Sequence, residues 1–221
     1  KTMQIAQQLY EGINIGSTRV GLITYMRTDS VRIAATAVEE VRAWIGEKYP
    51  NELPEAANEY AVGKKAQDAH EAIRPTYTKY TPDYVKEYLT RDQLRLYSII
   101  WERFVSSQMA NAKSRTVSTD IAIDEAVFRV SSTKIVEKGF YQVIKTLAAK
   151  EDRQKPLPDM KSGETVDLVT FHPEQHFTQG PARYTDASIV KTLEEKGIGR
   201  PSTYAPIISV LLDRYYVTRS N

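Results

Sequence analysis

The sequence predicts an α+β fold in which a helix-rich front and a helical tail flank a β-rich middle. Three observations lead to this prediction. Apolar residues recur with a helical period over most of residues 1–111, they alternate with a period of two between residues 114 and 136, and the helical period returns near the C-terminus. We therefore expect a helix-rich domain at 1–111, a β-rich segment at 112–181 and the start of a further helical domain at 182–221.

The composition is typical of a folded globular chain, because 41% of the 221 residues are hydrophobic and 26% are charged. No apolar run approaches the roughly 20 residues of a membrane helix, and the first residues lack a signal-peptide pattern. The sequence has no cysteine, which excludes disulfides, thiolate zinc sites and a cysteine nucleophile and favours a reducing, cytoplasmic location. The formal net charge is only +2 and no segment is strongly basic, so binding to nucleic acid would depend on a few well-placed cations.

Helices dominate the front part. Residues 90–93 have the sequence of a capping box and open the longest helix, which is expected to end near Asn111. Thr81 is a further N-cap, with Pro82 in the first helical position. The other expected helices cover residues 2–11, 34–48 and 67–74.

The middle part is expected to form strands at 114–123, 127–136 and 166–171, separated by loops that contain proline and glycine. In the tail, Thr185 is expected to cap a helix that runs to Lys196, and a second helix is expected from Pro201 toward Arg214.

Tyr25 is the first candidate for a functional residue. The alternation from residue 20 to residue 28 predicts a strand in which Ile23, Tyr25 and Arg27 share one face, so a phenol and a guanidinium would project side by side. A fixed cation favours the phenolate form, and a guanidinium can hold a phosphate with two hydrogen bonds. The pair would suit attack on a phosphodiester, whereas a single tyrosine among fourteen is usually structural.

His70 is the second candidate. The run HEAIR begins like a zinc-protease helix, but Arg74 stands where the second histidine is required, which argues against zinc hydrolysis. Gln67, His70 and Arg74 would form one polar stripe on the expected helix at 67–74 and could contact a phosphate. The alternative is that His70 is a solvated surface residue.

The third candidate is the glycine-containing run at 197–203. It superficially resembles a dinucleotide-binding loop, but it follows a helix instead of a strand and lacks the third glycine. We expect instead a tight turn and a new helix with Pro201 in the first position. The free N–H groups of that helix, the hydroxyls of Ser202 and Thr203 and the side chain of Arg200 would form an anion site. The alternative is a packing corner between two helices.

Three motifs follow one another along the chain: residues 7–11 (QQLYE) with 23–30 (ITYMRTDS), residues 69–75 (AHEAIRP) and residues 197–204 (GIGRPSTY). Together and in this order they resemble the motifs of the type IA DNA topoisomerases. Met26 after the tyrosine and Glu71 after the histidine are more similar to the bacterial topoisomerase I branch than to the topoisomerase III branch.

The resemblance implies a toroidal, ATP-independent isomerase of the bacterial nucleoid. In such an enzyme Tyr25 would attack single-stranded DNA and form a 5′-phosphotyrosine link, a second strand would pass, and the break would be resealed, which relaxes negative supercoils. The resemblance makes Tyr25 and Arg27 the catalytic residues, with Arg27 positioning the scissile phosphate. The DNA-binding residues that it implies are Arg27, His70, Arg200, Ser202, Thr203 and Arg214.

The family also carries clustered acidic residues and a catalytic lysine upstream of these motifs, and this sequence has no Asp-x-Asp pair. We therefore expect a fragment: the tyrosine domain, part of a β arch and the start of a helical DNA-binding domain, whose partners are single-stranded DNA and the missing domains. We expect no metal ligands within it, and magnesium would be held by the missing upstream domain. The chain alone is not expected to relax supercoiled DNA.

Two other functions remain open. The chain could be a non-catalytic module that binds single-stranded nucleic acid, with Tyr25 as a stacking platform worth about 1–3 kcal/mol per base. It could also be a tyrosine recombinase or type IB enzyme. Those enzymes place the tyrosine late in the chain, behind an Arg-His-Arg set, whereas Tyr25 comes first here.

Overall fold

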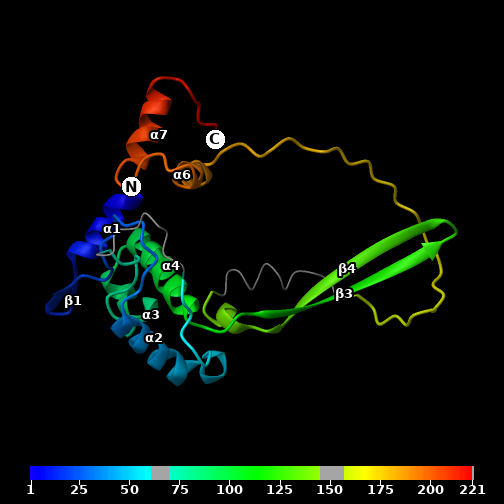
Figure 1. Cartoon of the computed structure of the whole chain (residues 1–221), viewed down its shortest axis with the longest axis horizontal. Helices are drawn as coiled ribbons and strands as arrows, with labels where there is room; N and C mark the ends of the chain where they lie inside the picture. The colour runs from blue at the N-terminus through cyan, green and yellow to red at the C-terminus, as the bar shows by residue number, and fades with distance from the viewer. Residues whose placement is uncertain (61–69, 145–156, 221) are drawn as a thin grey trace. The chain divides into compact units, whose positions relative to one another are not determined.

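The computed structural model describes residues 1–60, 70–144 and 157–220, and the chain divides into two compact units, Lys1–Met160 and Lys161–Asn221. Helices and strands both occur (Figure 1), which confirms the α+β class. The first unit contains α1 (Thr2–Glu11), β1 (Ile13–Ile15), β2 (Thr18–Val20), α2 (Ala35–Lys48), η1 (Pro50–Glu52), α3 (Pro82–Val85), η2 (Lys86–Tyr88), α4 (Arg91–Ser107), β3 (Lys113–Ile123), β4 (Ala126–Glu137) and η3 (Gly139–Gln142). The second contains α6 (Asp186–Glu195) and α7 (Tyr204–Asp213). No helix within the described residues has the length and apolarity needed to cross a membrane.

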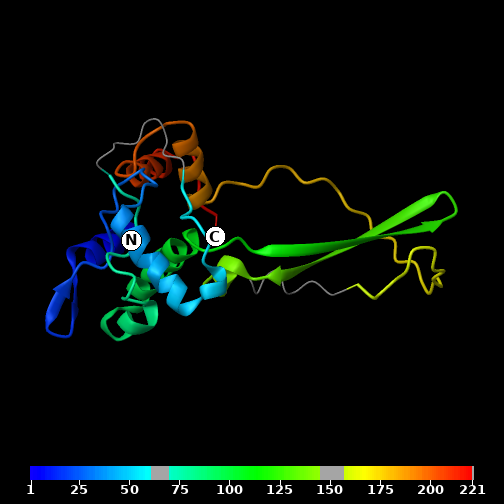
Figure 2. The same ribbon diagram turned by 60° about the horizontal axis from the view of Figure 1, so that its bottom comes forward.

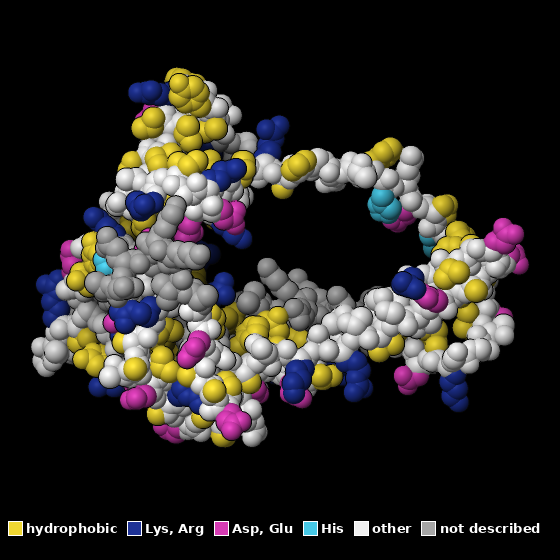
Figure 3. Space-filling view, viewed as in Figure 1, with side chains coloured by type: hydrophobic (Ala, Val, Ile, Leu, Met, Phe, Trp, Pro, Cys, Tyr) yellow, Lys and Arg dark blue, Asp and Glu magenta, His cyan; other side chains and the backbone are white. Residues whose placement is uncertain are grey.

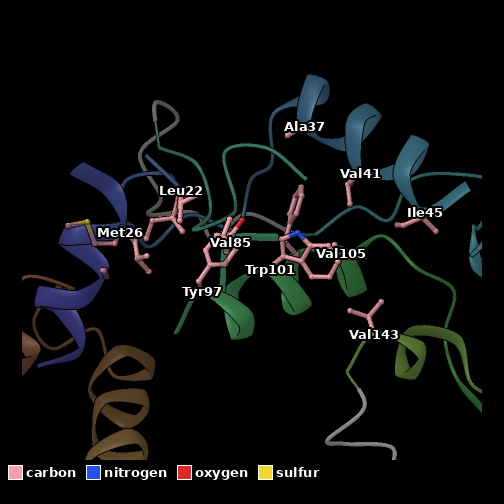
Figure 4. Packing of buried hydrophobic residues seen from close by; sticks show 14 of the residues in the cluster. Leu22, Met26, Ala37, Val41, Ile45, Val85, Tyr97, Trp101, Val105 and Val143 are labelled. Carbon is pink, nitrogen blue, oxygen red and sulfur yellow. The ribbon is translucent and has the colours of Figure 1, made fainter. Parts of the chain in front are cut away.

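The hydrophobic core of the first unit forms around α4. The indole of Trp101 is buried on this helix and meets the ring of Trp44 edge to face, with the ring centroids 5.1 Å apart. Figure 4 shows Ala37, Val41 and Ile45 of α2 pointing toward this side of α4, and all three are buried. The periodic apolar positions of two helices that are distant in sequence therefore pack against each other.

The predicted caps define where α4 begins. The hydroxyl of Thr90 accepts a hydrogen bond from the backbone N–H of Gln93, and the side chain of Gln93 accepts one from the backbone N–H of Thr90, which confirms the capping box. Thr81 likewise accepts from the N–H of Tyr84 at the start of α3, with Pro82 in the first position.

The end of α4 comes four residues earlier than the sequence predicts, because Glu52 and Asn58, in the segment after α2, form hydrogen bonds with residues 107–110. The side-chain amide of Asn58 donates to the carbonyls of Ser107 and Met109, at 2.9 and 3.0 Å, and the fully buried side chain of Gln108 bonds both backbone groups of Asn58. The N–H of Ala110 donates to the carbonyl of Glu52 instead of continuing the helix. The helix therefore ends at Ser107 and not near Asn111.

The predicted strands at 114–123 and 127–136 are confirmed as β3 and β4, an antiparallel pair that Figures 1 and 2 show as a twisted two-stranded ribbon. Side-chain hydroxyls pair across it, Thr116 with Thr133 at 2.9 Å and Ser118 with Ser131 at 2.8 Å. Near the turn, the guanidinium of Arg129 donates two hydrogen bonds to the carboxylate of Asp120 and lowers its pKa. Polar pairs of this kind fix the register of a ribbon whose side chains are largely exposed.

Three regular elements that the sequence predicts are not formed in the described residues. Residues 21–28 form no regular strand, and only Ile23 makes an isolated antiparallel bridge, to Pro75. Residues 70–74 are not helical, and the rest of the helix expected at 67–74 lies outside the described residues. Residues 166–171 are irregular and exposed, and they pair with no strand among the described residues.

The tail helices begin differently from each other. Thr185 and Ser188 form a capping box at the start of α6, as the sequence predicts. The second helix begins at Tyr204 with Thr203 as its N-cap, three residues later than the start expected at Pro201. The division of the chain at residues 111 and 181 remains a prediction.

Candidate active site

Tyr25 lies in an irregular segment, residues 21–28, between β2 and α2. Leu22 and Met26 are buried in the core, whereas the Tyr25 side chain is 43% exposed and Arg27 is also exposed. Figure 4 shows Leu22 and Met26 in the cluster of core residues. The buried side chains therefore fix the segment to the core, while its phenol and its guanidinium reach solvent. The strand that was expected to place Tyr25 and Arg27 on one face is not formed. Ile23 departs from that face because it is buried.

Backbone hydrogen bonds fix this segment to a second one, at 72–76. The N–H of Thr24 donates to the carbonyl of Arg74 at 2.9 Å, and the N–H of Thr76 donates to the carbonyl of Leu22 at 3.1 Å. The hydroxyl of Thr76 adds a 2.5 Å hydrogen bond to the carbonyl of Gly21. These contacts join the first and second motifs, which are about fifty residues apart in the sequence.

Thr24 contributes the most specific of these contacts. Its hydroxyl donates to the carbonyl of Ala72 at 2.7 Å and accepts from the N–H of Arg74 at 2.9 Å. A hydroxyl is one of the few groups that can donate and accept at once, so both backbone groups of the facing loop are satisfied by one side chain. In the sequence, only the position next to Tyr25 pointed to this role, and Thr24 was not among the predicted site residues.

The ring of Tyr25 is also positioned from α1. The rings of Tyr10 and Tyr25 meet edge to face, with centroids 5.4 Å apart and planes at 65°. The close approach of the two segments requires glycine at residue 21, because a Cβ there would lie 2.6 Å from the carbonyl oxygen of Tyr10. The N–H of Leu22 donates to the carbonyl of Leu9 beside it. The motif at 7–11 therefore supports the segment that carries Tyr25.

The loop of the second motif is fixed internally by an ion pair. The guanidinium of Arg74 donates to the carboxylate of Glu71 at 2.9 Å and to the carbonyl of Pro75 at 3.0 Å, and only 12% of the Arg74 side chain is exposed. Arg74 is therefore occupied within the loop and does not share a polar helical stripe with His70. His70 is half-buried at the beginning of the described part of this loop.

The run at 197–203 forms a hydrogen-bonded turn in the second unit. The hydroxyl of Thr203 accepts from the N–H of Arg200 at 2.8 Å, while the N–H groups of Thr203 and Tyr204 both donate to the carbonyl of Arg200. Two of the N–H groups expected to bind an anion are therefore satisfied internally. The side chains of Arg200, Ser202 and Thr203 remain exposed.

Arg214 lies at the opposite end of α7 from this turn, because Thr203 is the N-cap and Arg214 the C-cap of the same ten-residue helix. A helix of that length spans about 15 Å. The structure thus brings together Arg200, Ser202 and Thr203 but places Arg214 a helix length away.

Within the described residues, no group of three or more His, Asp or Glu side chains could hold a metal ion. The described residues therefore do not fit a magnesium site.

An exposed phenol and an exposed guanidinium thus lie on one anchored segment. The comparisons with known proteins identify the class of protein as the DNA topoisomerases. A family model described as DNA topoisomerase matches residues 1–221, and this chain therefore belongs to the DNA topoisomerase family.

Relatives named DNA topoisomerase 1 match nearly the whole chain. The protein from Treponema pallidum is 62% identical over 219 residues, which are 99% of this chain and 30% of the relative. The protein from Xylella fastidiosa strain Temecula1 is 51% identical over 226 residues, which are 98% of this chain and 28% of the relative. The chain thus spans less than a third of the length of these relatives.

A solved structure shows the same fold. Full-length topoisomerase I from Thermotoga maritima superposes with a TM-score of 0.81 and 38% sequence identity, covering all of this chain and 35% of that protein. The recognition of the family from the three motifs is therefore confirmed. The roles of the individual site residues stay predictions.

Proposed function

We propose that this chain supplies the strand-cleaving tyrosine of an ATP-independent DNA topoisomerase that relaxes negative supercoils. The observation that carries the proposal is the position of Tyr25, which is exposed and two residues before an exposed arginine on an anchored segment, in a chain that the DNA topoisomerase family model matches throughout. Single-stranded DNA is the proposed substrate, and the nucleoid in the bacterial cytoplasm is the proposed location.

In the proposed reaction the Oη atom of Tyr25 attacks the phosphorus of a phosphodiester. The phenol loses its proton as the bond from Oη to phosphorus forms, the bond from phosphorus to the 3′ oxygen breaks, and that oxygen takes up a proton and leaves as a hydroxyl. After a strand has passed, the 3′ hydroxyl loses its proton and attacks phosphorus, and Tyr25 leaves and regains its proton. One phosphoester bond is exchanged for another in each step, so no ATP is consumed.

Arg27 is the proposed partner of the scissile phosphate. It is exposed and forms no ion pair within the described residues, so its guanidinium is available to donate two hydrogen bonds to phosphate oxygens.

His70 is proposed to contact the DNA nearby, since its loop is hydrogen-bonded to the segment that carries Tyr25. The turn with Arg200, Ser202 and Thr203, and the more distant Arg214, are proposed to bind the DNA backbone.

A non-catalytic module that binds single strands is the second candidate function. The observation that favours it is the half-exposed pair of rings formed by Tyr10 and Tyr25, which could stack on bases without any chemistry. Under that alternative the hydroxyl of Tyr25 would have no role, and its removal would leave DNA binding unchanged.

Covalent capture tests the choice between the two functions. We would replace the matching region of the Treponema pallidum relative with this sequence and incubate the chimera with labelled single-stranded DNA and magnesium. The expected result is a denaturant-stable adduct with the chimera, none with its Tyr25→Phe variant, and none with the 221-residue chain alone. Tyr10→Phe is the matched control, since it also removes one tyrosine hydroxyl from the same pair of rings.

An adduct that persists in the Tyr25→Phe chimera would refute Tyr25 as the nucleophile. If neither chimera forms an adduct and both bind the strand equally well, the binding-module function is supported instead. Magnesium-dependent relaxation of supercoiled DNA by the chain alone would contradict the expectation that it lacks part of the catalytic machinery.

A further inference from the structure

A groove of about 720 Å³ opens beside the candidate active site. Its walls come from α1, from β2 and from the loop that follows Pro75. The residues on its walls that can bind a ligand through charge or an aromatic ring are Tyr10, Arg19, Arg74, Tyr77, Lys79 and Tyr80. Cations and tyrosines thus gather in one concave surface, and neither aspartate nor glutamate lines it.

Two of the three cations are available to a ligand. Arg74 is neutralised by Glu71, but Arg19 and Lys79 are exposed and form no ion pair in the part of the chain that the structure describes. The groove therefore carries two unneutralised positive charges, although the chain as a whole has a net charge of only +2. An anionic ligand is the complement of such a surface.

Arg19 is held in place by the backbone around it. Its side chain crosses Gly12, where an added Cβ would lie 2.9 Å from the Cγ atom of Arg19. Gly12 has a φ of +117°, in the region that favours glycine, so the turn after α1 provides the space that this side chain occupies. An arginine whose stem is supported in this way loses less conformational entropy when its guanidinium binds a ligand.

The lining that follows Pro75 combines a cation with aromatic rings. The Nζ atom of Lys79 lies 5.3 Å from the ring centroids of both Tyr77 and Tyr80, and these two rings meet edge to face at 5.7 Å. Tyr77 is 49% exposed, so one ring remains open to a flat partner. Alternating cations and open aromatic rings are the features by which proteins hold single-stranded nucleic acid.

Tyr10 connects this groove to the candidate active site, because it lines the groove and its ring also contacts the ring of Tyr25. We propose that the groove is a binding site for the segment of a single strand that continues beyond the phosphate at Tyr25, with Arg19 and Lys79 on its phosphates and Tyr77 stacked on a base. The proposal rests on the proposed function, since it takes the strand cleaved at Tyr25 as the ligand.

The test measures the binding of a short fluorescent oligothymidylate to the 221-residue chain by anisotropy over a series of salt concentrations. The double variant Arg19→Gln/Lys79→Gln is expected to bind about tenfold more weakly. The slope of log K against log salt should fall by about 1.4, because each phosphate contact on a single strand contributes about 0.7. Tyr77→Ala is expected to weaken binding by about fivefold or more and Tyr77→Phe to preserve it, because the phenylalanine ring still stacks.

The matched control is Lys48→Gln/Lys134→Gln, which removes two exposed lysines from α2 and β4, outside the groove, and should leave affinity and slope unchanged. Equal losses in the groove variant and the control, or no binding by the unmodified chain, would overturn the proposal. Displacement of the strand by a polyglutamate peptide as effectively as by unlabelled oligothymidylate would also overturn it, in favour of an acidic polypeptide. If the chimera forms no covalent adduct but the chain still binds oligothymidylate through the groove residues, only the proposed chemistry of Tyr25 is contradicted. The two proposals can therefore fail separately.

Discussion

At the scale of single residues, Thr24 determines how the two motifs of the candidate active site meet. Replacing it with valine keeps the shape of the side chain but removes the donor to Ala72 and the acceptor for the N–H of Arg74. Leaving partly buried backbone groups unsatisfied costs about 1–3 kcal/mol. Thr24→Val is therefore expected to lower the free energy of unfolding by about that amount in urea denaturation, and to reduce the rate of adduct formation in the chimera.

Thr24→Ser is the control for this prediction, because it keeps the hydroxyl and loses only a methyl group. If the serine and valine variants lose stability equally, the methyl contact would account for the effect and the hydrogen bonds would not.

The sequence predicts single residues only where their neighbours in the chain determine their environment. Local alternation placed Tyr25 and Arg27 on one face, and both are exposed, but Ile23, which was expected on the same face, is buried. The role of Thr24 could not be predicted in the same way, because its partners lie in a loop about fifty residues away. The Glu71–Arg74 ion pair could not be predicted either, because the residues expected to form a helix there adopt a loop conformation. The groove was missed for the same reason, since Arg19 and Lys79 come together only in the folded chain.

At the scale of elements, a buried tyrosine on α4, Tyr97, links this helix to the loop before α3. The hydroxyl of Tyr97 donates to the carbonyl of Tyr80, and burial raises the pKa of Tyr97 well above its ordinary value. The folded state keeps its proton while the unfolded chain releases it above about pH 10. The contribution of Tyr97 to stability is thus fully present below about pH 10 and is lost as the pH rises through the folded pKa, by up to about 1.4 kcal/mol per pH unit.

Tyr97→Phe isolates this effect. At neutral pH the variant should lose about 1 kcal/mol, because one hydrogen bond disappears and the carbonyl of Tyr80 loses its partner. Above about pH 10, where an unfolded tyrosine begins to ionise, its unfolding free energy should fall less steeply with pH than that of the unmodified chain. Urea denaturation at several pH values measures both, and parallel pH profiles for the two proteins would contradict the assignment.

Elements were predicted correctly where caps and apolar periodicity act locally. α1, α2, α4 and α6 begin within one residue of their expected starts. In α4 and α6 the reason is a local cap, because Thr90 and Thr185 accept hydrogen bonds from backbone N–H groups of their own helices. The strand expected at 166–171 failed because alternation alone provides no hydrogen-bonding partner. The start of α7 was misplaced because Pro201 fits a turn as well as the first helical position, and the hydroxyl of Thr203 stabilises the turn.

At the scale of the whole molecule, the two compact units differ in how much they bury. The first unit has a continuous core around α4, whereas neither α6 nor α7 contains a buried residue. Figure 3 shows hydrophobic side chains on the surface of the region that contains these helices, and Ile198 and Val210 are each about half exposed. Helices of ten residues are marginal in water unless tertiary packing supports them.

Hydrogen exchange should therefore separate the two units. In the 221-residue chain we expect the backbone amides of α6 and α7 to exchange at least about a hundredfold faster than those in the centre of α4, because local opening of the tail exposes little additional apolar surface. Exchange monitored by mass spectrometry on peptides from each helix measures the difference. Binding of oligothymidylate should slow exchange in the tail if the turn with Arg200 binds the strand, and Arg200→Gln should remove that protection while exchange in α4 stays the same. Equal protection of α7 and α4 without DNA would show that the apolar side chains of the tail are packed more tightly in solution than their exposure indicates.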